Sequence, residues 1–244
     1  MKTTNNTVLI TGGSAGIGLS IARAFLAKGN EVIITGRDEA RLREAARELG
    51  PVTTIVGDVS RPEDVDRLVD RVQRDFPALN VLVNNAGKAH LYDPAGIADK
   101  GGEEIQTNYL SVIRLTERLL PLLRQQPEAA VVNVTSVLAF VPSMAVPTYA
   151  ASKAALHSYT QALRLILQKT PVKVFELMPP LVNTEFSKEI GGEKGIAPEV
   201  VAEELLRALA EDVYEIRVGG TEDLYRLSLS SPEQALLAVN AGRL

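Results

Sequence analysis

Two hydrophobic patterns alternate along the chain. Short apolar runs rich in valine and isoleucine indicate strands buried on both faces, and longer stretches with apolar residues three or four positions apart indicate helices. The strand-like runs are 7–11, 31–35, 52–57, 80–84, 130–135, 172–178 and 214–218. The helical stretches are 17–28, 39–49, 62–75, 103–125, 149–168 and 199–210, with another near 232–240.

This alternation predicts the α/β fold class. Strands joined by right-handed helical crossovers form a parallel sheet with helices on both faces, which is a doubly wound architecture. At 244 residues, 45% of them hydrophobic, we expect a single domain over 1–244. Two segments interrupt the pattern: 88–102, expected to be a loop beside the site, and 185–198, whose glycines favour a lid. Residues 219–244 are expected to form a C-terminal extension.

A glycine-rich segment, Gly12-Gly-Ser-Ala-Gly16-Ile-Gly18, lies between the first strand and the first helix. Glycines let the backbone approach a pyrophosphate, and a helix start presents free N–H groups and the positive end of the helix dipole. The spacing differs from the commoner G-x-G-x-x-G, and a flexible turn is the alternative. With a strand before it and a helix after it, the segment predicts phosphate binding.

Polar residues follow nearly every predicted strand. Ligands of an open parallel sheet bind at the carboxyl ends of its strands, so polar residues gathered there indicate a site. Asp58 has an alternative role as a cap of the helix that begins near Pro62. The residues at these strand ends are Arg37, Asp58, Asn84, Asn85, Ser136 and the segment from Pro179 to Thr184.

Tyr149 and Lys153 are four residues apart in a predicted helix, so they share one face of it. A free tyrosine has a pKa near ~10 and is a poor proton donor at neutral pH. An ammonium ~4 Å away, at an effective dielectric of ~20, contributes about 4 kcal/mol. We therefore expect the phenol to titrate near ~7, where general acid–base catalysis works best. The alternative is a half-buried tyrosine above a surface lysine.

Composition excludes several classes of function. Lysine plus arginine number 26 against 30 aspartates and glutamates, and this net charge of −4 argues against a nucleic-acid binder. Cysteine is absent, so we expect no disulfide, no thiolate metal site and no cysteine nucleophile. We expect no metal, no signal peptide and no membrane span, and therefore a cytoplasmic protein.

Together the motifs resemble those of the classical short-chain dehydrogenases/reductases, over about residues 5–220. The resemblance implies a nicotinamide-dependent oxidoreductase with a Rossmann-type, seven-stranded parallel sheet. Leu138-Ala-Phe-Val-Pro142 and Pro179-Pro-Leu-Val-Asn-Thr184 are similar to a bacterial subgroup found with teichoic-acid D-alanylation genes. In one departure, Pro180 replaces the usual family glycine. The motifs are Thr11-Gly12-x3-Gly16-x-Gly18, Asn84-Asn85-Ala86-Gly87, Asn108, Ser136 and Tyr149-x3-Lys153.

The resemblance also implies a role for each matching residue. Tyr149 is the proton donor or base, Ser136 binds the substrate oxygen, and Lys153 holds the nicotinamide ribose. Asn108 anchors a water that links Lys153 to solvent. The implied cofactor-binding set is Gly12, Ser14, Gly16, Ile17, Gly18, Arg37, Asp58, Val59, Asn85, Ala86, Gly87, Tyr149, Lys153, Pro179, Val182 and Thr184. His90, in a loop, is interpreted as a solvated residue. His157, in a helix, is interpreted as a packing or interface residue.

The end of the second strand indicates the cofactor. NAD-binding chains place an acid there for the ribose 2′-hydroxyl, whereas an arginine suits the 2′-phosphate of NADP. Gly36 stands at the acidic position and Arg37 follows it, while Asp38 is explained as the cap of the next helix. A basic residue often present in the glycine turn is replaced by Ser14. We expect NADP(H), with NAD(H) as the alternative.

The expected activity is reduction of a neutral, fairly hydrophobic ketone or aldehyde, or oxidation of the corresponding alcohol. An NAD-dependent alcohol dehydrogenase and a non-catalytic nucleotide sensor are the alternatives. The expected pocket lining is Leu138, Phe140, Val141, Leu181 and Phe186.

The predicted helices 103–125 and 149–168 carry apolar residues on more than one face, which favours a homodimer or homotetramer. These residues are Leu115, Leu119, Leu120, Leu122, Leu156, Leu163, Leu165 and Ile166.

Overall fold

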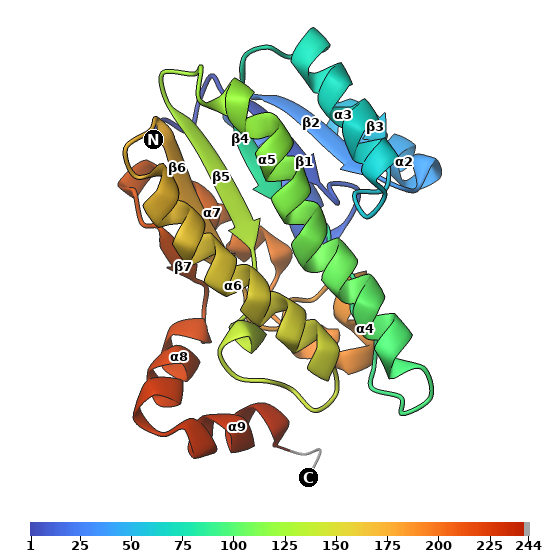
Figure 1. The fold of residues 1–244 in the computed structure, drawn as a ribbon, viewed down its shortest axis with the longest axis vertical. Coiled ribbons are helices and arrows are strands. Elements are labelled where there is room, and N and C mark those ends of the chain that lie inside the picture. The colour runs from blue at the N-terminus through green and yellow to red at the C-terminus, as the bar shows by residue number, and fades with distance from the viewer. Residues whose placement is uncertain (242–244) are drawn as a thin grey trace.

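Seven parallel strands form one sheet, in the order β3-β2-β1-β4-β5-β6-β7 (Figure 1). The computed structural model describes residues 1–241, so the last three residues of the predicted extension lie outside it. Every predicted strand is present, nearly at its predicted bounds. The strands are β1 (Thr7–Thr11), β2 (Glu31–Gly36), β3 (Thr53–Val56), β4 (Leu79–Asn84), β5 (Ala129–Val134), β6 (Val172–Met178) and β7 (Glu215–Arg217).

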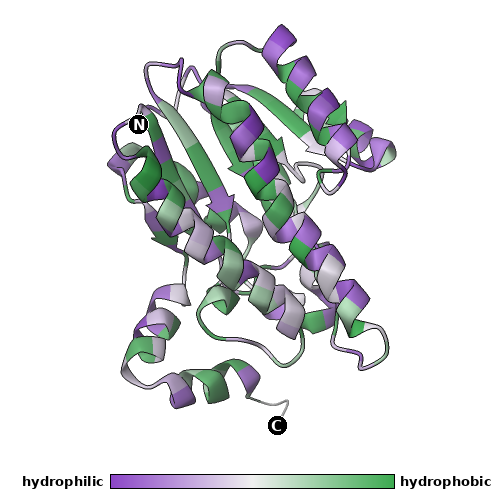
Figure 2. Cartoon of the chain, in the orientation of Figure 1, coloured by the Kyte–Doolittle hydropathy of each residue, from purple (hydrophilic) through white to green (hydrophobic). Residues whose placement is uncertain are grey.

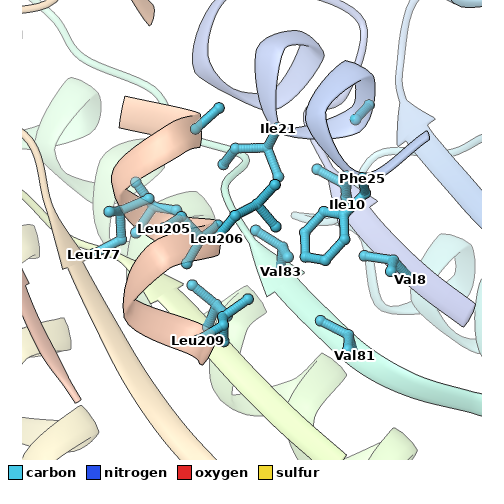
Figure 3. Packing of buried hydrophobic residues seen from close by; sticks show 14 of the residues in the cluster. Val8, Ile10, Ile21, Phe25, Val81, Val83, Leu177, Leu205, Leu206 and Leu209 are labelled. Atoms are coloured by element: carbon cyan, nitrogen blue, oxygen red, sulfur yellow. The ribbon is translucent and has the colours of Figure 1, made fainter. Parts of the chain in front are cut away.

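Helices cover both faces of the sheet, as predicted. Because strand side chains alternate, Val8 and Ile10 of β1 join one core and Leu9 joins the other. Figure 3 shows Phe25 packed in the first core, and Figure 2 shows the mostly apolar strands at the centre of the molecule. The first core contains α1 (Gly16–Ala27), α2 (Glu39–Leu49) and α7 (Pro198–Glu211), and the second contains α3 (Pro62–Asp75), α5 (Ser111–Leu123) and α6 (Pro147–Leu167).

A ladder of buried polar side chains crosses the middle of the sheet. Asn84 of β4 and Asn133 of β5 are registered partners, and the Asn84 amide donates to Asn133 Oδ1 at 2.9 Å. Asn84 also donates to Thr116 of α5, and Asn133 donates to Thr160 of α6. The ladder therefore joins two strands to the two helices that cover them.

The predicted loop over 88–102 is wrong in its second half. Helix α4 (Ile97–Ile105) begins there, after Gly96 in a left-handed conformation with φ +79°. Its glycines have a low helix propensity, so the sequence does not predict this helix. Gly101 packs closely on Thr148, since a Cβ on Gly101 would lie 2.9 Å from Thr148 Cγ2. The predicted helix 103–125 is also interrupted, by the π-helical segment η1 (Gln106–Leu110). π turns inside helices occur frequently at functional sites.

The C-terminal extension is more helical than predicted. Helix α8 (Thr221–Ser230) precedes the expected α9 (Pro232–Asn240), and the two project together from the body of the molecule (Figure 1). An ion pair between Arg226 and Glu222 and the stacking of Arg217 on Tyr225 stabilise α8 despite its serines. The predicted lid contains two short 3-10 turns, η3 (Glu185–Ile190) and η4 (Gly192–Lys194).

Most of the leucines predicted to form excess apolar surface on α5 and α6 are buried in the chain itself. Leu115, Leu119, Leu122 and Leu163 join the second core. Only Leu165 and Ile166 of that set are strongly exposed, at 67% and 68%. The buried ones are Leu115, Leu119, Leu122, Leu156 and Leu163. None of the helices within residues 1–241 is long and apolar enough to cross a membrane.

Candidate active site

The glycine turn after β1 has the geometry of an anion cradle. Gly12 and Gly16 adopt left-handed conformations, with φ of +64° and +53°. A Cβ on Gly18 would lie 2.3 Å from the Gly12 carbonyl oxygen, so only glycine fits. Helix α1 begins behind the turn with no side-chain cap and no acid in its first turn. Its free N–H groups and dipole favour a negatively charged group at this point.

Two other strand ends close on this turn. The Asn85 amide donates to the carbonyls of Thr11 and Gly12, at 2.9 and 3.1 Å, and the Thr11 hydroxyl accepts from the N–H groups of Asn85 and Ala86. From the other side, Thr184 contacts the turn, since a Cβ on Gly16 would lie 3.1 Å from Thr184 Cγ2. Residues that follow β1, β4 and β6 therefore meet at one place.

Arg37 and Asp58 lie at the ends of β2 and β3. The Arg37 side chain is exposed, and its charge acts on Asp58. Burial opposes ionisation of Asp58, but hydrogen bonds from the Ser60 hydroxyl and N–H, with Arg37 and Lys88, hold the pKa of that carboxyl below its usual range. Asp58 does not cap α3, whose first residues follow Arg61, whereas Asp38 caps α2 by accepting from Arg41 N at 3.1 Å. The capping alternative is thus excluded for Asp58 and confirmed for Asp38.

Ser136, Tyr149 and Lys153 lie together beyond the end of β5. The Ser136 hydroxyl lies close enough to the Tyr149 phenol to act on its pKa, and it accepts from Leu138 N at 3.1 Å. Lys153, only 4% exposed, places Nζ 5.6 Å from the centre of the Tyr149 ring. A hydroxyl pair beside a buried ammonium can bind a carbonyl oxygen and deliver a proton to it.

The prediction of a lowered phenol pKa is wrong for this structure. Burial raises the pKa of Tyr149 to about 12; the neighbouring Ser136 hydroxyl opposes the shift and the charge of Glu104 adds to it. The reason is the position of the ammonium, which donates to the Val134 carbonyl at 2.8 Å and lies over the ring rather than at the hydroxyl. The spacing of Tyr149 and Lys153 predicts that they share a helix face, but it does not predict where the Lys153 ammonium points.

Replacing Lys153 by methionine should stabilise the unliganded protein at pH 7. Burial lowers the pKa of Lys153 from 10.5 to about 8, so folding at pH 7 must bury a charge, and the unfolding free energy should rise as pH increases from about 8 to 10.5. After allowance for the Val134 carbonyl left unpaired, Lys153→Met should gain on the order of 1–2 kcal/mol at pH 7 and nothing at pH 10.5. Urea unfolding at both pH values, with exposed Lys169→Met as the control, measures this gain; equal stability at pH 7 would contradict it.

Asn108 lies in the π-helical segment, buried against α6. Its side-chain amide donates to the Lys88 carbonyl and to Ser152 Oγ, and its oxygen accepts from Lys88 N at 2.8 Å. These bonds fix the segment after β4 relative to α6. The side chain is fully engaged in this way, and its implied water-anchoring role remains a prediction.

A family model described as short chain dehydrogenase matches residues 6–195, which is more than half of the chain. The chain belongs to this family. The uncharacterized oxidoreductase DltE of Bacillus subtilis is 44% identical over 237 residues, covering 93% of this chain and 94% of that protein. It follows that the protein is an oxidoreductase of the short-chain dehydrogenase type.

Two solved structures of the family agree with the fold. L-sorbose reductase from Gluconobacter frateurii, complexed with NADPH and L-sorbose, is 28% identical with a TM-score of 0.77, over 84% of this chain and 89% of that one. A short chain dehydrogenase/reductase from Burkholderia phymatum, in complex with NAD, is 21% identical with a TM-score of 0.88, over 96% of each chain. The second likeness concerns the fold alone.

The apolar lining predicted for a short-chain dehydrogenase substrate pocket is divided in this chain. Phe186 of the lid packs against Tyr149, with ring centres 5.9 Å apart. Phe140 packs on His157 and Tyr225. It lines a cavity of about 560 Å³ together with Val141 and residues of the C-terminal helices. The place of Phe140 and Val141 in a substrate lining remains a prediction.

Most of the remaining predicted site residues lie just after the strands that they follow in the sequence. Val59 is buried after β3, and the Pro179 carbonyl accepts from Val137 N. Val182 bridges Ile196 across the base of the lid. His157 packs inward and bonds the buried Glu176 at 2.9 Å, as expected of a packing residue. Gly87 lies where Asn108 and Lys153 converge.

Sequence reasoning missed Glu104, which is fully buried on α4 beside the site. Its position held a signal: residues 101, 104 and 108 share one helix face, and the other two positions carry a glycine and the family asparagine. A helix face that carries a glycine and the family asparagine is expected to pack against the rest of the protein, so an acid on the same face is expected to be buried.

Proposed function

We propose that this protein transfers a hydride between NADP(H) and a neutral, fairly hydrophobic ketone or aldehyde, or the corresponding alcohol. The observation that carries the proposal is the meeting of Ser136, Tyr149 and Lys153 at the same sheet edge as the glycine turn. A nucleotide sensor without turnover has no need of all three residues. An NAD-dependent alcohol dehydrogenase would use the same groups, and the end of β2 argues against it.

The residues present fit a dinucleotide. The left-handed glycines and the uncapped start of α1 suit its pyrophosphate, and Asp58 and Val59 stand where its adenine is expected. Beside them, a cavity of about 290 Å³ is lined by Ser60, Lys88 and Thr107. When bound, a nicotinamide supplies or accepts the hydride. Lys153 and Thr184 are proposed to hold the nicotinamide end, and Asn85 to Gly87 are proposed to run beside the ribose of the adenine end.

The protein's own groups then handle the proton. Ser136 and Tyr149 both donate hydrogen bonds to the carbonyl oxygen, which positions it and stabilises the negative charge that develops on it. Tyr149 gives its hydroxyl proton to that oxygen as the alcohol forms. In the reverse direction the phenolate accepts the alcohol proton. The half-exposed Phe186 and the partly buried Leu138 and Leu181 support an apolar substrate rather than an anionic one.

The end of β2 supports NADP over NAD. No carboxylate stands at Gly36, and a Cβ there would lie 3.5 Å from Ser14 Oγ. Arg37 is exposed beside it, and its planar guanidinium suits a 2′-phosphate. Asp38 is engaged in capping α2. Solved family members are found with either cofactor, so the preference rests on Arg37.

A panel of ketones and aldehydes, assayed with NADPH and with NADH, tests the proposal. Oxidation of NADPH by at least one apolar member is expected, with a higher kcat/KM than for NADH. No turnover with any member would contradict the activity, and equal kcat/KM for both cofactors would contradict the NADP assignment.

Replacing Arg37 by alanine should lower the NADPH preference by roughly ten- to a hundredfold, because a charge-assisted phosphate contact contributes ~1.5–3 kcal/mol. The ratio of kcat/KM values for NADPH and NADH measures the change. Arg41→Ala is the matched control, since Arg41 is also exposed and lies in the first turn of α2. A ratio in Arg37→Ala equal to that of the control would show that Arg37 does not read the phosphate.

The chain is further proposed to act as one catalytic domain, with 185–198 as the lid over the substrate. A homodimer or homotetramer is proposed from the exposed Leu165 and Ile166 on α6. Small-molecule carbonyl compounds and alcohols are its proposed partners, in the cytoplasm.

A further inference from the structure

Glu104 is a buried carboxylate with incomplete hydrogen bonding. Its side chain is 0% exposed, and Oε1 accepts from the backbone N–H of His90 at 2.6 Å. Oε2 is buried and has no hydrogen-bond partner among residues 1–241. Burying a carboxylate oxygen without a partner is costly, so this position is not explained by folding alone.

Contacts before and after Glu104 in the sequence place it against α6. Gly101 packs on Thr148, and Asn108 donates to Ser152 Oγ at 2.9 Å. Glu104 lies between Gly101 and Asn108 on one helix, and Tyr149 lies between Thr148 and Ser152 on the other. The charge of Glu104 accordingly acts on the Tyr149 phenol.

The remaining groups around Tyr149 do not replace this charge. Lys153, on the same helix, bonds the Val134 carbonyl. Lys88 and His90, from the segment after β4, both pair with the exposed Glu103. The lid contributes the Phe186 ring, and β5 is followed by the neutral Ser136.

We propose that Glu104 is a positioning residue of the active site, which anchors the segment at His90 and keeps the Tyr149 hydroxyl in its protonated, proton-donating form. The proposal rests on the proposed function, in which protonated Tyr149 is the acid of carbonyl reduction. Reduction is then favoured over a broad pH range. Alcohol oxidation, which needs the phenolate, is confined to more alkaline pH.

Glu104→Gln tests this inference, because glutamine retains an oxygen for the His90 N–H and removes the charge. The midpoint of the pH profile for alcohol oxidation should move to lower pH, as should the alkaline fall of reduction. Glu117→Gln is the control: Glu117 is an exposed acid on α5 and should leave both midpoints unchanged. Unmoved midpoints in Glu104→Gln would overturn the proposal.

A titration without substrate separates this inference from the proposed function. Subtracting the ultraviolet titration of a Tyr149→Phe variant from that of the unmodified protein isolates the ionisation of Tyr149. The same subtraction in the Glu104→Gln background should give a midpoint at lower pH. If no carbonyl compound is turned over but the midpoint moves, the proposed function fails and the role of Glu104 stands. Should Glu104→Gln not fold, Glu104→Leu fills the same space without a charge and should give the same shift. A variant that loses stability while its Tyr149 midpoint stays in place would show a purely structural role.

Discussion

Tyr149→Phe is expected to lose a factor of ~10²–10⁴ in turnover while keeping its fold and its affinity for the cofactor. Phenylalanine preserves the packing of the ring against Phe186 and removes only the hydroxyl that lies near Ser136. The loss should therefore appear in kcat for any substrate found in the carbonyl panel.

Tyr159→Phe is the matched control for this change. Tyr159 is on the same helix, and its ring packs edge-on against Tyr109 at 6.3 Å. The control should retain nearly full turnover. Full activity in Tyr149→Phe, or an equal loss in both variants, would refute the assignment of Tyr149 as the acid.

Gly18→Ala is expected to weaken dinucleotide binding by at least ~100-fold, which is about 2.7 kcal/mol. The new methyl group would lie 2.3 Å from the Gly12 carbonyl oxygen and 2.5 Å from Asn85 Nδ2. The obstacle on one side is backbone, so the glycine turn itself must shift. Overpacking of this kind costs about 1–3 kcal/mol and would displace the N–H groups that face the pyrophosphate.

Fluorescence titration with NADPH measures this loss. Gly220→Ala is the control, because Gly220 has no other atom within 4 Å of an added Cβ and does not have a positive φ. It should bind as the unmodified protein does. A folded Gly18→Ala protein with affinity within about threefold of the control would contradict a cradle formed by the turn.

The sheet was predictable because buried parallel strands leave a strong local signal. Runs such as 130–135 are apolar throughout, and their order along the chain limits the topology. Helices α4 and α8 were not predictable in this way. The first depends on the contact between Gly101 and Thr148, and the second on the stacking of Arg217 on Tyr225, and neither contact is local.

The candidate site shows the same division between pattern and geometry. Its residues were found from motifs, but the direction of each side chain depends on neighbours distant in sequence. Lys153 turns to the Val134 carbonyl, and Phe140 turns to Tyr225. Glu104 was missed because its effect on Tyr149 arises only when α4 packs on α6.

The amide ladder of Asn84 and Asn133 has a consequence for assembly of the two halves of the site. β4 leads directly to Asn85 at the glycine turn, and β5 leads to Ser136 beside Tyr149. If β5 paired with β4 one residue out of step, each asparagine would lose its amide partner within the core, and the apolar residues of β5 would exchange faces. Mispairing is thus penalised where it would separate the proposed cofactor residues from the proposed catalytic ones. The paired asparagines therefore favour the observed register of β4 and β5.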